Sequence, residues 1–130
     1  MERFEVVTTR REELVDITAA VQGALRTAGL AEGAVLVYCP HTTAAITINE
    51  NADPAVASDL IEGLRDLVPG QGHWRHSEGN SDGHVKSSLV GASEVVPVSD
   101  GHLVLGTWQA IWFCEFDGPR HRHVYVQALP

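Results

Sequence analysis

The sequence has no hydrophobic run long enough to cross a membrane, because a transmembrane helix needs roughly 20 consecutive apolar residues. Residues 1–7 (MERFEVV) also lack the apolar centre of a secretion signal. We therefore expect a cytoplasmic protein with no membrane partner.

Basic residues are scarce, since nine lysines and arginines stand against 17 aspartates and glutamates, for a formal net charge of −8. A nucleic acid or an anionic membrane bound through bulk charge requires a basic face. Neither partner is expected for this chain. A local basic pocket for a single phosphate is compatible with the same total.

Cysteine is almost absent, because only Cys39 and Cys114 are present and they form no CxxC pair. This excludes a zinc ribbon and a thioredoxin-type motif. Apolar or aromatic residues flank both cysteines, which predicts buried, reduced thiols that pack as small hydrophobic groups. Internal repeats, low-complexity tracts and linkers are also lacking, so we expect a single domain over residues 1–130.

The order of predicted elements indicates an α+β fold. Strands are expected over residues 3–8, 34–39, 43–49, 93–98, 102–106, 109–117 and 120–129. Thr9 and Glu12 form a capping-box pattern, which predicts a first helix ending at Gly29. Asp53 followed by Pro54 predicts the start of a second helix, which ends before residues 69–70 (PG). Mostly antiparallel strands with two helices inserted early make an α+β domain.

The most polar stretch, residues 76–91 (HSEGNSDGHVKSSLVG), is predicted to be a loop that carries the site. Its glycines, asparagine, aspartate and serines are equally typical of an ordinary surface loop. His76 and His84 favour a site, because turns do not require histidine.

Three of the seven histidines, His41, His76 and His84, lie at the edges of predicted elements. Brought together, their imidazoles would bind a divalent metal, zinc or a similar ion, and leave one position open. The alternative is three separate, hydrogen-bonded surface histidines. His121 and His123 are expected to be solvated or to lie in a subunit contact, and His73 and His102 to lie on the surface.

Other polar residues are candidates for binding an anion or a substrate. Lys86 and Ser87 resemble the end of a phosphate-binding loop, but Val85 stands where that motif needs glycine, so the nucleotide hypothesis fails. A phosphate contact by Lys86 together with Arg120 and a solvated lysine are both compatible with the sequence.

Two further positions lie next to turns or strand ends. Glu50 lies between a strand and a helix and caps nothing obvious, so a catalytic and a structural role are equally compatible. Gln109, which follows residues 106–108 (GTW), is a candidate for contacting the amide or ring of a ligand.

Four segments together resemble the YjbQ family, also called UPF0047 or the secondary thiamine-phosphate synthase family. They are residues 41–54 (HTTAAITINENADP), 78–91 (EGN at the start, HVKSSLVG at the end), 106–109 (GTWQ) and 115–120 (EFDGPR). The resemblance spans nearly the whole chain. It implies a mostly antiparallel α+β sandwich that forms a homotrimer, with a polar pocket near the subunit boundaries.

The resemblance also implies thiamine-phosphate synthase activity, in which a pyrimidine pyrophosphate is joined to a thiazole phosphate and pyrophosphate is released. The expected phosphate-neutralising groups are Lys86 and Arg120, and Glu78 or Glu50 would orient a ligand or act as a base. Departing pyrophosphate normally uses Mg²⁺, whereas three imidazoles prefer zinc or a similar metal. The alternatives are a metal- or anion-binding module without turnover and a metal-assisted hydrolase.

The expected site residues fall into three groups. The metal ligands are His41, His76 and His84; the catalytic residues are Glu78, Lys86 and Glu50; the substrate-binding residues are Asn80, Ser87, Thr107, Gln109 and Arg120. The segment between Glu78 and His84 is shorter here than in some relatives, which leaves the position of Asp82 open.

Overall fold

The computed structural model describes residues 1–72 and 74–130, so the expectation for His73 lies outside the described residues. The elements, in chain order, are β1 (Glu2–Val7), β2 (Glu13–Asp16), α1 (Thr18–Ala28), β3 (Gly33–Tyr38), β4 (Ala44–Glu50), α2 (Pro54–Leu67), α3 (Ser81–Val90), β5 (Ser93–Ser99), β6 (His102–Leu103), β7 (Gln109–Glu115) and β8 (His121–Leu129). Among the helices described, none is long and apolar enough to cross a membrane.

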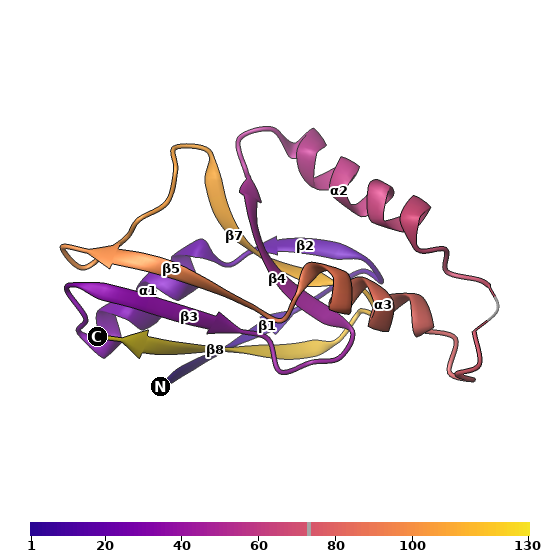
Figure 1. Ribbon diagram of the computed structural model, residues 1–130, viewed down its shortest axis with the longest axis horizontal. Coiled ribbons are helices and arrows are strands. Elements are labelled where there is room, and N and C mark those ends of the chain that lie inside the picture. The colour runs from indigo at the N-terminus through magenta and orange to yellow at the C-terminus, as the bar shows by residue number, and fades with distance from the viewer. Residues whose placement is uncertain (73) are drawn as a thin grey trace.

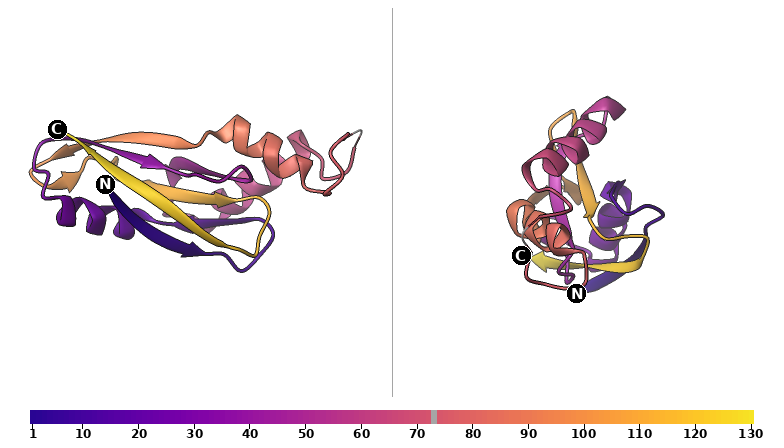
Figure 2. Two further views of the ribbon diagram at one scale, coloured as in Figure 1. Left: turned by 90° about the horizontal axis from the view of Figure 1, so that it is seen from below. Right: turned by 90° about the vertical axis from the view of Figure 1, so that its right-hand side faces the viewer.

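The strands form two antiparallel sheets (Figures 1 and 2). The larger sheet has the order β1-β8-β3-β5-β6, and the smaller sheet has the order β2-β7-β4. Helix α1 lies behind the larger sheet, and α2 and α3 lie at the side of the smaller one (Figure 1). The predicted α+β class with mostly antiparallel strands is confirmed.

The main hydrophobic core lies between the two sheets and α1. Alternate residues of each strand point into it, as the period of two in a strand requires. Its fully buried members include Val35 from β3, Val124 from β8, Phe113 from β7 and Val21 from α1. The two cysteines are also buried and reduced, as predicted, and burial raises the pKa of the Cys114 thiol to about 12.

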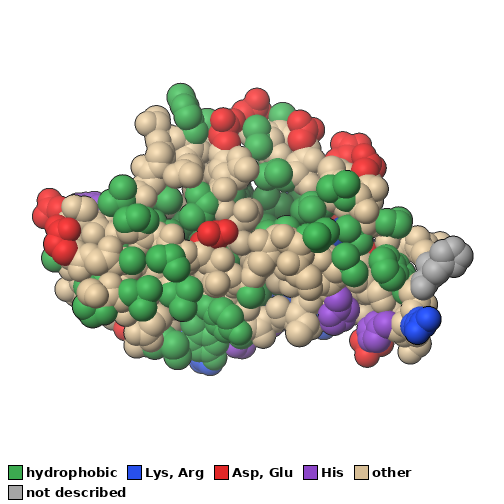
Figure 3. Space-filling view, viewed as in Figure 1, with side chains coloured by type: hydrophobic (Ala, Val, Ile, Leu, Met, Phe, Trp, Pro, Cys, Tyr) green, Lys and Arg blue, Asp and Glu red, His purple; other side chains and the backbone are tan. Residues whose placement is uncertain are grey.

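The outer face of the larger sheet carries exposed apolar side chains. Tyr38 and Val95 are among them, and a shallow groove nearby is lined by Met1, Leu36, Tyr38, Tyr125 and Gln127. Figure 3 shows apolar side chains gathered over β3, β5 and β8. This face therefore presents an apolar surface to solvent.

The first helix starts later than the sequence predicted. The Thr9 backbone N–H donates to the Glu13 carboxylate at 2.9 Å, which closes a turn where a helix was expected. Strand β2 follows and pairs with β7, and α1 begins only at Thr18, whose N–H donates to Asp16 Oδ1 at 3.0 Å. The predicted end at Gly29, with a φ of 71°, is confirmed.

The second helix begins as predicted. Pro54 is its first residue, and Asp53 Oδ1 accepts a hydrogen bond from the Ala55 N–H at 2.9 Å. This bond caps one of the first backbone N–H groups of α2.

The prediction of a loop over residues 76–91 is wrong for its second half, because residues 81–90 form helix α3. Gly83 lets this helix approach the smaller sheet closely, since a Cβ there would lie 3.1 Å from the Phe116 carbonyl oxygen. The Ser87 hydroxyl donates to the Ala44 carbonyl at 2.6 Å. Part of the polarity of α3 thus comes from side chains that pair inside the protein.

Two charged residues of α3 are buried in a network of ion pairs. Lys86 Nζ lies 3.0 Å from Glu12 and 3.3 Å from Asp82, and Arg11 binds both carboxylate oxygens of Asp82. Burial alone would raise the pKa of Asp82, but the hydrogen bond and charge of Arg11, and then those of Lys86, hold it below its usual value. This network, the α3 network, fastens the helix to the β1–β2 connection.

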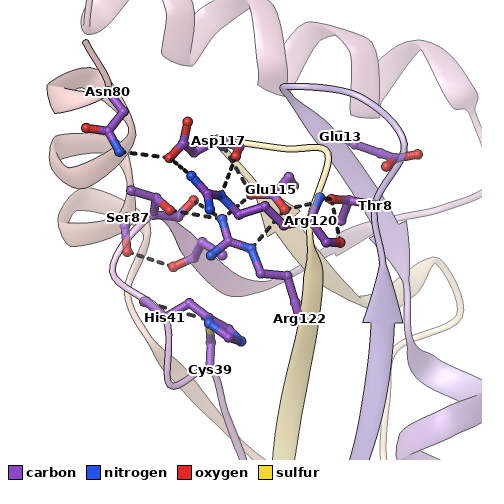
Figure 4. A network of polar contacts seen from close by, with 12 residues as sticks. Thr8, Glu13, Cys39, His41, Asn80, Ser87, Glu115, Asp117, Arg120 and Arg122 are labelled. Carbon is purple, nitrogen blue, oxygen red and sulfur yellow. Dashed lines mark hydrogen bonds and ion pairs between the residues drawn. The ribbon is translucent and has the colours of Figure 1, made fainter. Parts of the chain in front are cut away.

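A second buried ion pair joins β7 and β8. Arg122 bonds to both carboxylate oxygens of Glu115 and to Thr43 Oγ1, while Thr8 donates to Glu115 at 2.7 Å (Figure 4). Glu115 is fully buried, and the pair's further partners, Thr8 and Thr43, come from two other segments. The pair therefore ties β1, the β3–β4 loop and β8 together beneath α3.

Because breaking a buried pair leaves an unpaired charge, we expect Arg122→Met to lower the free energy of unfolding by about 3–5 kcal/mol. The double variant Glu115→Gln/Arg122→Met should lose clearly less, since a neutral amide costs less to bury than a carboxylate. Urea denaturation of the three proteins measures both differences. Equal losses in the single and double variants would contradict this account.

Candidate functional site

A pocket of about 380 Å³ lies at the end of the molecule where α3 begins. Its lining residues come from the α2–α3 connection and the first half of α3: Trp74, Arg75, His76, Ser81, His84 and Val85. Figure 3 shows histidine side chains and a basic side chain gathered at this end, below the α2–α3 connection. The pocket is called the α3 pocket below.

Two of the predicted histidines meet in the α3 pocket. The ring centroids of His76 and His84 lie 5.4 Å apart, with the ring planes at 83° to each other. His76 Nε2 lies 3.7 Å from Glu78 Oε1, and both side chains are largely exposed. The predicted residues His76, Glu78 and His84 are thus brought together.

The start of α3 leaves two buried polar atoms without a partner among the described residues, Asn80 Oδ1 and Ser81 Oγ. Asn80 is the N-cap of α3, but its side chain makes no capping hydrogen bond. The Gly83 and His84 N–H groups both bond to the Asn80 carbonyl. Buried polar groups are normally paired, often by an ordered water, and these two atoms have almost no accessible surface of their own.

Asn80 and Arg120 are linked through Asp117. The Asn80 amide donates to Asp117 Oδ2 at 2.8 Å, and Arg120 donates to the same oxygen at 3.0 Å (Figure 4). Arg120 remains half exposed. These two predicted substrate-binding residues are therefore neighbours, and both are attached to the beginning of α3.

Lys86 and Ser87 occupy structural positions. The Lys86 side chain is only 1% exposed and has two carboxylate partners, and the Ser87 hydroxyl is bonded to β4. The predictions that Lys86 neutralises a phosphate and that Ser87 binds substrate do not fit this arrangement. A buried ammonium must be paired, and in this protein Glu12 and Asp82 supply the pairing.

Three other predicted residues lie at the far end of β4 and β7. Glu50 pairs with Gln109 in the sheet, six residues along β4 from Ala44, which contacts α3. At about 3.3 Å per residue this separation is about 20 Å. Gln109 Oε1 accepts a hydrogen bond from the Gly106 N–H at 2.8 Å, which closes the loop that carries exposed Thr107. These residues therefore do not line the α3 pocket.

His41 pairs with a different histidine. The His123 backbone N–H donates to His41 Nε2 at 3.0 Å, and the two rings lie 5.0 Å apart. The pairing of β3 with β8 ends at Tyr38 and Tyr125. Beyond this point the His41 ring, instead of a β3 carbonyl, accepts the hydrogen bond from the His123 N–H of β8. Burial first, and then the Arg122 charge, lower the pKa of His41.

The prediction that His41, His76 and His84 form one cluster is therefore wrong within a single chain. Over residues 1–72 and 74–130, no three histidine, cysteine, aspartate or glutamate side chains are arranged to hold a metal ion. The histidines form two pairs because His41 is committed to the edge of β8.

A larger hollow of about 580 Å³ lies beside α1, between Asp16, Gln22 and Leu105. Its polar side chains are already used: Asp16 accepts from Thr18, and Gln22 donates to the Gly101 carbonyl and accepts from the Leu103 N–H. The α3 pocket is the better candidate because two adjacent imidazoles and the Arg75 side chain line it.

Sequence reasoning missed four pocket residues and one buried charge pair. Trp74, Arg75, Ser81 and Val85 were not singled out, although Arg75 adjoins His76 and Ser81 follows an N-cap-like asparagine. The ion pair of Glu115 had a clearer signal, because a carboxylate within an otherwise apolar strand requires a partner.

The fold and pocket define a class: a small α+β sandwich protein with a histidine-lined pocket at one helix start. The family model described as UPF0047 protein YjbQ-like matches residues 2–130. The chain belongs to this family. The UPF0047 protein YugU of Bacillus subtilis is 50% identical and covers 99% of this chain and 98% of its own length. The UPF0047 protein MJ1081 of Methanocaldococcus jannaschii is also 50% identical, over 98% of this chain and 92% of its own.

Solved structures agree with this fold. A YjbQ/UPF0047-family protein of Clostridium acetobutylicum has a TM-score of 0.95 and 46% identity, covering 98% of each chain. The protein APE1520 of Aeropyrum pernix has a TM-score of 0.93 and 42% identity, covering 98% of this chain and 96% of its own. The sequence matches establish the family, and the structural matches establish the fold.

The lowered pKa of His41 predicts a pH dependence. In the unfolded chain His41 takes up a proton near pH 6.5, whereas in the folded chain it does so only at a lower pH. The stability that neutral His41 contributes is therefore fully present above pH 6.5 and is lost as the pH falls through the folded pKa. His41→Leu should cost about 1 kcal/mol at pH 8, and its difference from the wild type should shrink toward pH 5.

Urea denaturation at a series of pH values measures this difference. Exposed His121, on the same strand as His123, provides the control variant His121→Gln, which should show no such trend. A constant difference between His41→Leu and the wild type across the range would rule out this role.

Proposed function

We propose that this protein binds a phosphorylated small molecule in the α3 pocket and acts on it as a thiamine-phosphate-synthase-like transferase. The observation that supports this most is the pairing of His76 and His84 in a pocket that also contains Arg75. Imidazole and guanidinium groups are suited to oxyanions, since both donate N–H groups and carry or accept positive charge.

The residues of the α3 pocket have specific roles in this proposal. Arg75, His76 and His84 neutralise the phosphate, because Lys86 is already paired with Glu12 and Asp82. Arg120, half exposed and held by Asp117, lies next to the start of α3 and supplies a further positive charge. Glu78 orients His76 through their 3.7 Å contact.

In the proposed reaction, the thiazole nitrogen uses its lone pair to form a C–N bond with the methylene carbon of the pyrimidine. The C–O bond to pyrophosphate breaks, and its electron pair leaves with the pyrophosphate. A protonated His84 or His76 donates a proton to the departing oxygen, which lowers the charge that develops there. The substrate and the reaction come from the family resemblance, and the proximity of His76 and His84 supports their proposed role as proton donors.

A divalent metal is compatible with the donor types but not with their arrangement in one chain. His76 and His84 would be two ligands for zinc or a similar ion, and a third donor is not in place among the described residues. We therefore assign proton transfer and charge neutralisation to the protein side chains. Mg²⁺ accompanying the pyrophosphate remains part of the proposal as a substrate-bound ion.

A hydrolase is the second candidate, because the contact between Glu78 and His76 would also orient a base for an attacking water. Pyrophosphate released only with the thiazole phosphate supports the transferase. Release without that partner supports the hydrolase. Binding without release supports a module that binds anions or metals.

We also propose a cytoplasmic homotrimer. The exposed apolar face of the larger sheet, with Tyr38 and Val95, supports association between copies. Sedimentation velocity of the purified protein tests the number of subunits.

Because a positioned acid contributes about 10²-fold or more to a rate, we expect His84→Gln to lower pyrophosphate release by at least that factor. His102→Gln, an exposed histidine on β6, should leave the rate unchanged. The assay measures pyrophosphate from the pyrimidine substrate with and without the thiazole phosphate. An unchanged rate in an active His84→Gln protein would contradict the proposed role.

A further inference from the structure

We infer that Trp74 is the stacking platform for the pyrimidine ring of the pyrophosphate substrate, and that it gives the α3 pocket a preference for aromatic over aliphatic phosphate esters. This inference rests on the proposed function for the identity of the ligand. It adds a specificity-determining residue to a site whose other named residues act on the phosphate groups.

The position of the Trp74 indole is the first observation. The residue is 39% exposed and lines the α3 pocket, so part of the indole is open to a ligand while the rest is covered by the protein. A Cβ built at Gly72 would lie 3.7 Å from Nε1 and from Cε2 of the indole, which places this edge of the ring system against the chain two residues earlier. A tryptophan side chain has only two rotatable bonds, so it loses little conformational freedom when a ligand binds to it.

The other two tryptophans are placed differently. Trp112 lies within β7, and its Nε1 donates to the Asn49 carbonyl at 3.3 Å. Trp108 is 62% exposed and precedes β7, at the end of β4 and β7 that lies away from the α3 pocket. Of the three tryptophans, Trp74 is the one that lines this pocket.

Val85 supplies a second apolar surface in the pocket. Ser81, His84 and Val85 are three and four residues apart on α3, so they lie on one face of the helix. Trp74 comes from the α2–α3 connection, and the two apolar side chains therefore belong to the two segments that line the pocket. A flat ring bound between these segments contacts an indole and a branched aliphatic side chain, and burial of these apolar surfaces favours binding.

The polar residues decide which substrate carries that ring. In the proposed reaction, His76 or His84 protonates the departing pyrophosphate, which places the pyrophosphate beside these histidines and Arg75. The pyrimidine is joined to the pyrophosphate through one methylene group, so its ring must lie close to the phosphate oxygens. Trp74 adjoins Arg75 in the chain and lines the same pocket. The ring that stacks on Trp74 is therefore the pyrimidine.

The test compares Trp74→Ala and Trp74→Phe with Trp108→Phe, a control variant at the far end of β7. A pyrimidinylmethyl phosphate, which has no pyrophosphate to release, is titrated into each full-length protein, and its affinity is measured by calorimetry. Because bases stack favourably on aromatic side chains, we expect Trp74→Ala to bind this ester about 10-fold or more weakly than the wild type. Trp74→Phe should retain most of the affinity, and Trp108→Phe all of it.

Two further probes separate stacking from phosphate binding. Cyclohexylmethyl phosphate has a ring of similar size without π electrons, and inorganic pyrophosphate has no ring. The wild type should bind the pyrimidine ester more tightly than the cyclohexyl ester, and Trp74→Ala should remove this difference while its affinity for pyrophosphate stays unchanged. Equal affinity of the wild type for the two esters, or an equal loss of pyrophosphate affinity in Trp74→Ala, would contradict the inference.

Tryptophan fluorescence gives a readout that a purely structural role of Trp74 would not produce. Stacking of the pyrimidine on the indole should quench the emission of the wild type and of Trp108→Phe. The emission of Trp74→Phe should not change when the ester is added. Quenching that persists in Trp74→Phe, or unchanged affinity in Trp74→Ala, would overturn the role of Trp74 as the platform.

The pyrophosphate-release assay judges the proposed function separately. With the pyrimidine pyrophosphate as substrate, Trp74→Ala should raise KM about 10-fold and leave kcat nearly unchanged, because stacking holds the ring equally in the ground state and the transition state. Release by Trp74→Ala with an unchanged KM removes the platform and keeps the transferase. Ester binding that depends on Trp74, without any release by the wild type, supports the platform and removes the transferase.

Discussion

The pairing of buried charges is the constraint on which the site depends. Asp82 and Lys86 enter the protein interior on α3 only because Arg11 and Glu12 meet them there. Buried ions are expensive unless each finds an opposite charge with good geometry, so the network fixes both the rotation of the helix and its distance from the β1–β2 connection. That rotation turns His84 toward the pocket while Asp82 and Lys86 face the interior.

The sequence predicted the fold class, most strands, α2 and the end of α1, because these depend on local signals such as alternation, caps and glycine turns. It failed at α3, where the residues that look like a loop are held as a helix by partners far away in the chain. Glu12 lies in a connection before α1, and Ala44 begins β4. No local pattern reveals such partners.

The site was predicted only in part for the same reason. His76, Glu78 and His84 are near one another in sequence, and they meet in space. The positions of His41, Glu50 and Gln109 depend on how the strands pair, which the sequence does not show. Glu50 pairs with Gln109 at the far end of β4, and His41 accepts a hydrogen bond from the His123 N–H on β8.

The two-residue strand β6 affects how copies of this protein can associate. It is an edge strand of the five-stranded sheet, so a strand from another molecule could form very few backbone hydrogen bonds with it. Short edge strands of this type discourage the edge-to-edge strand pairing that leads to aggregates. Contacts between copies at this edge of the sheet must instead be made through side chains.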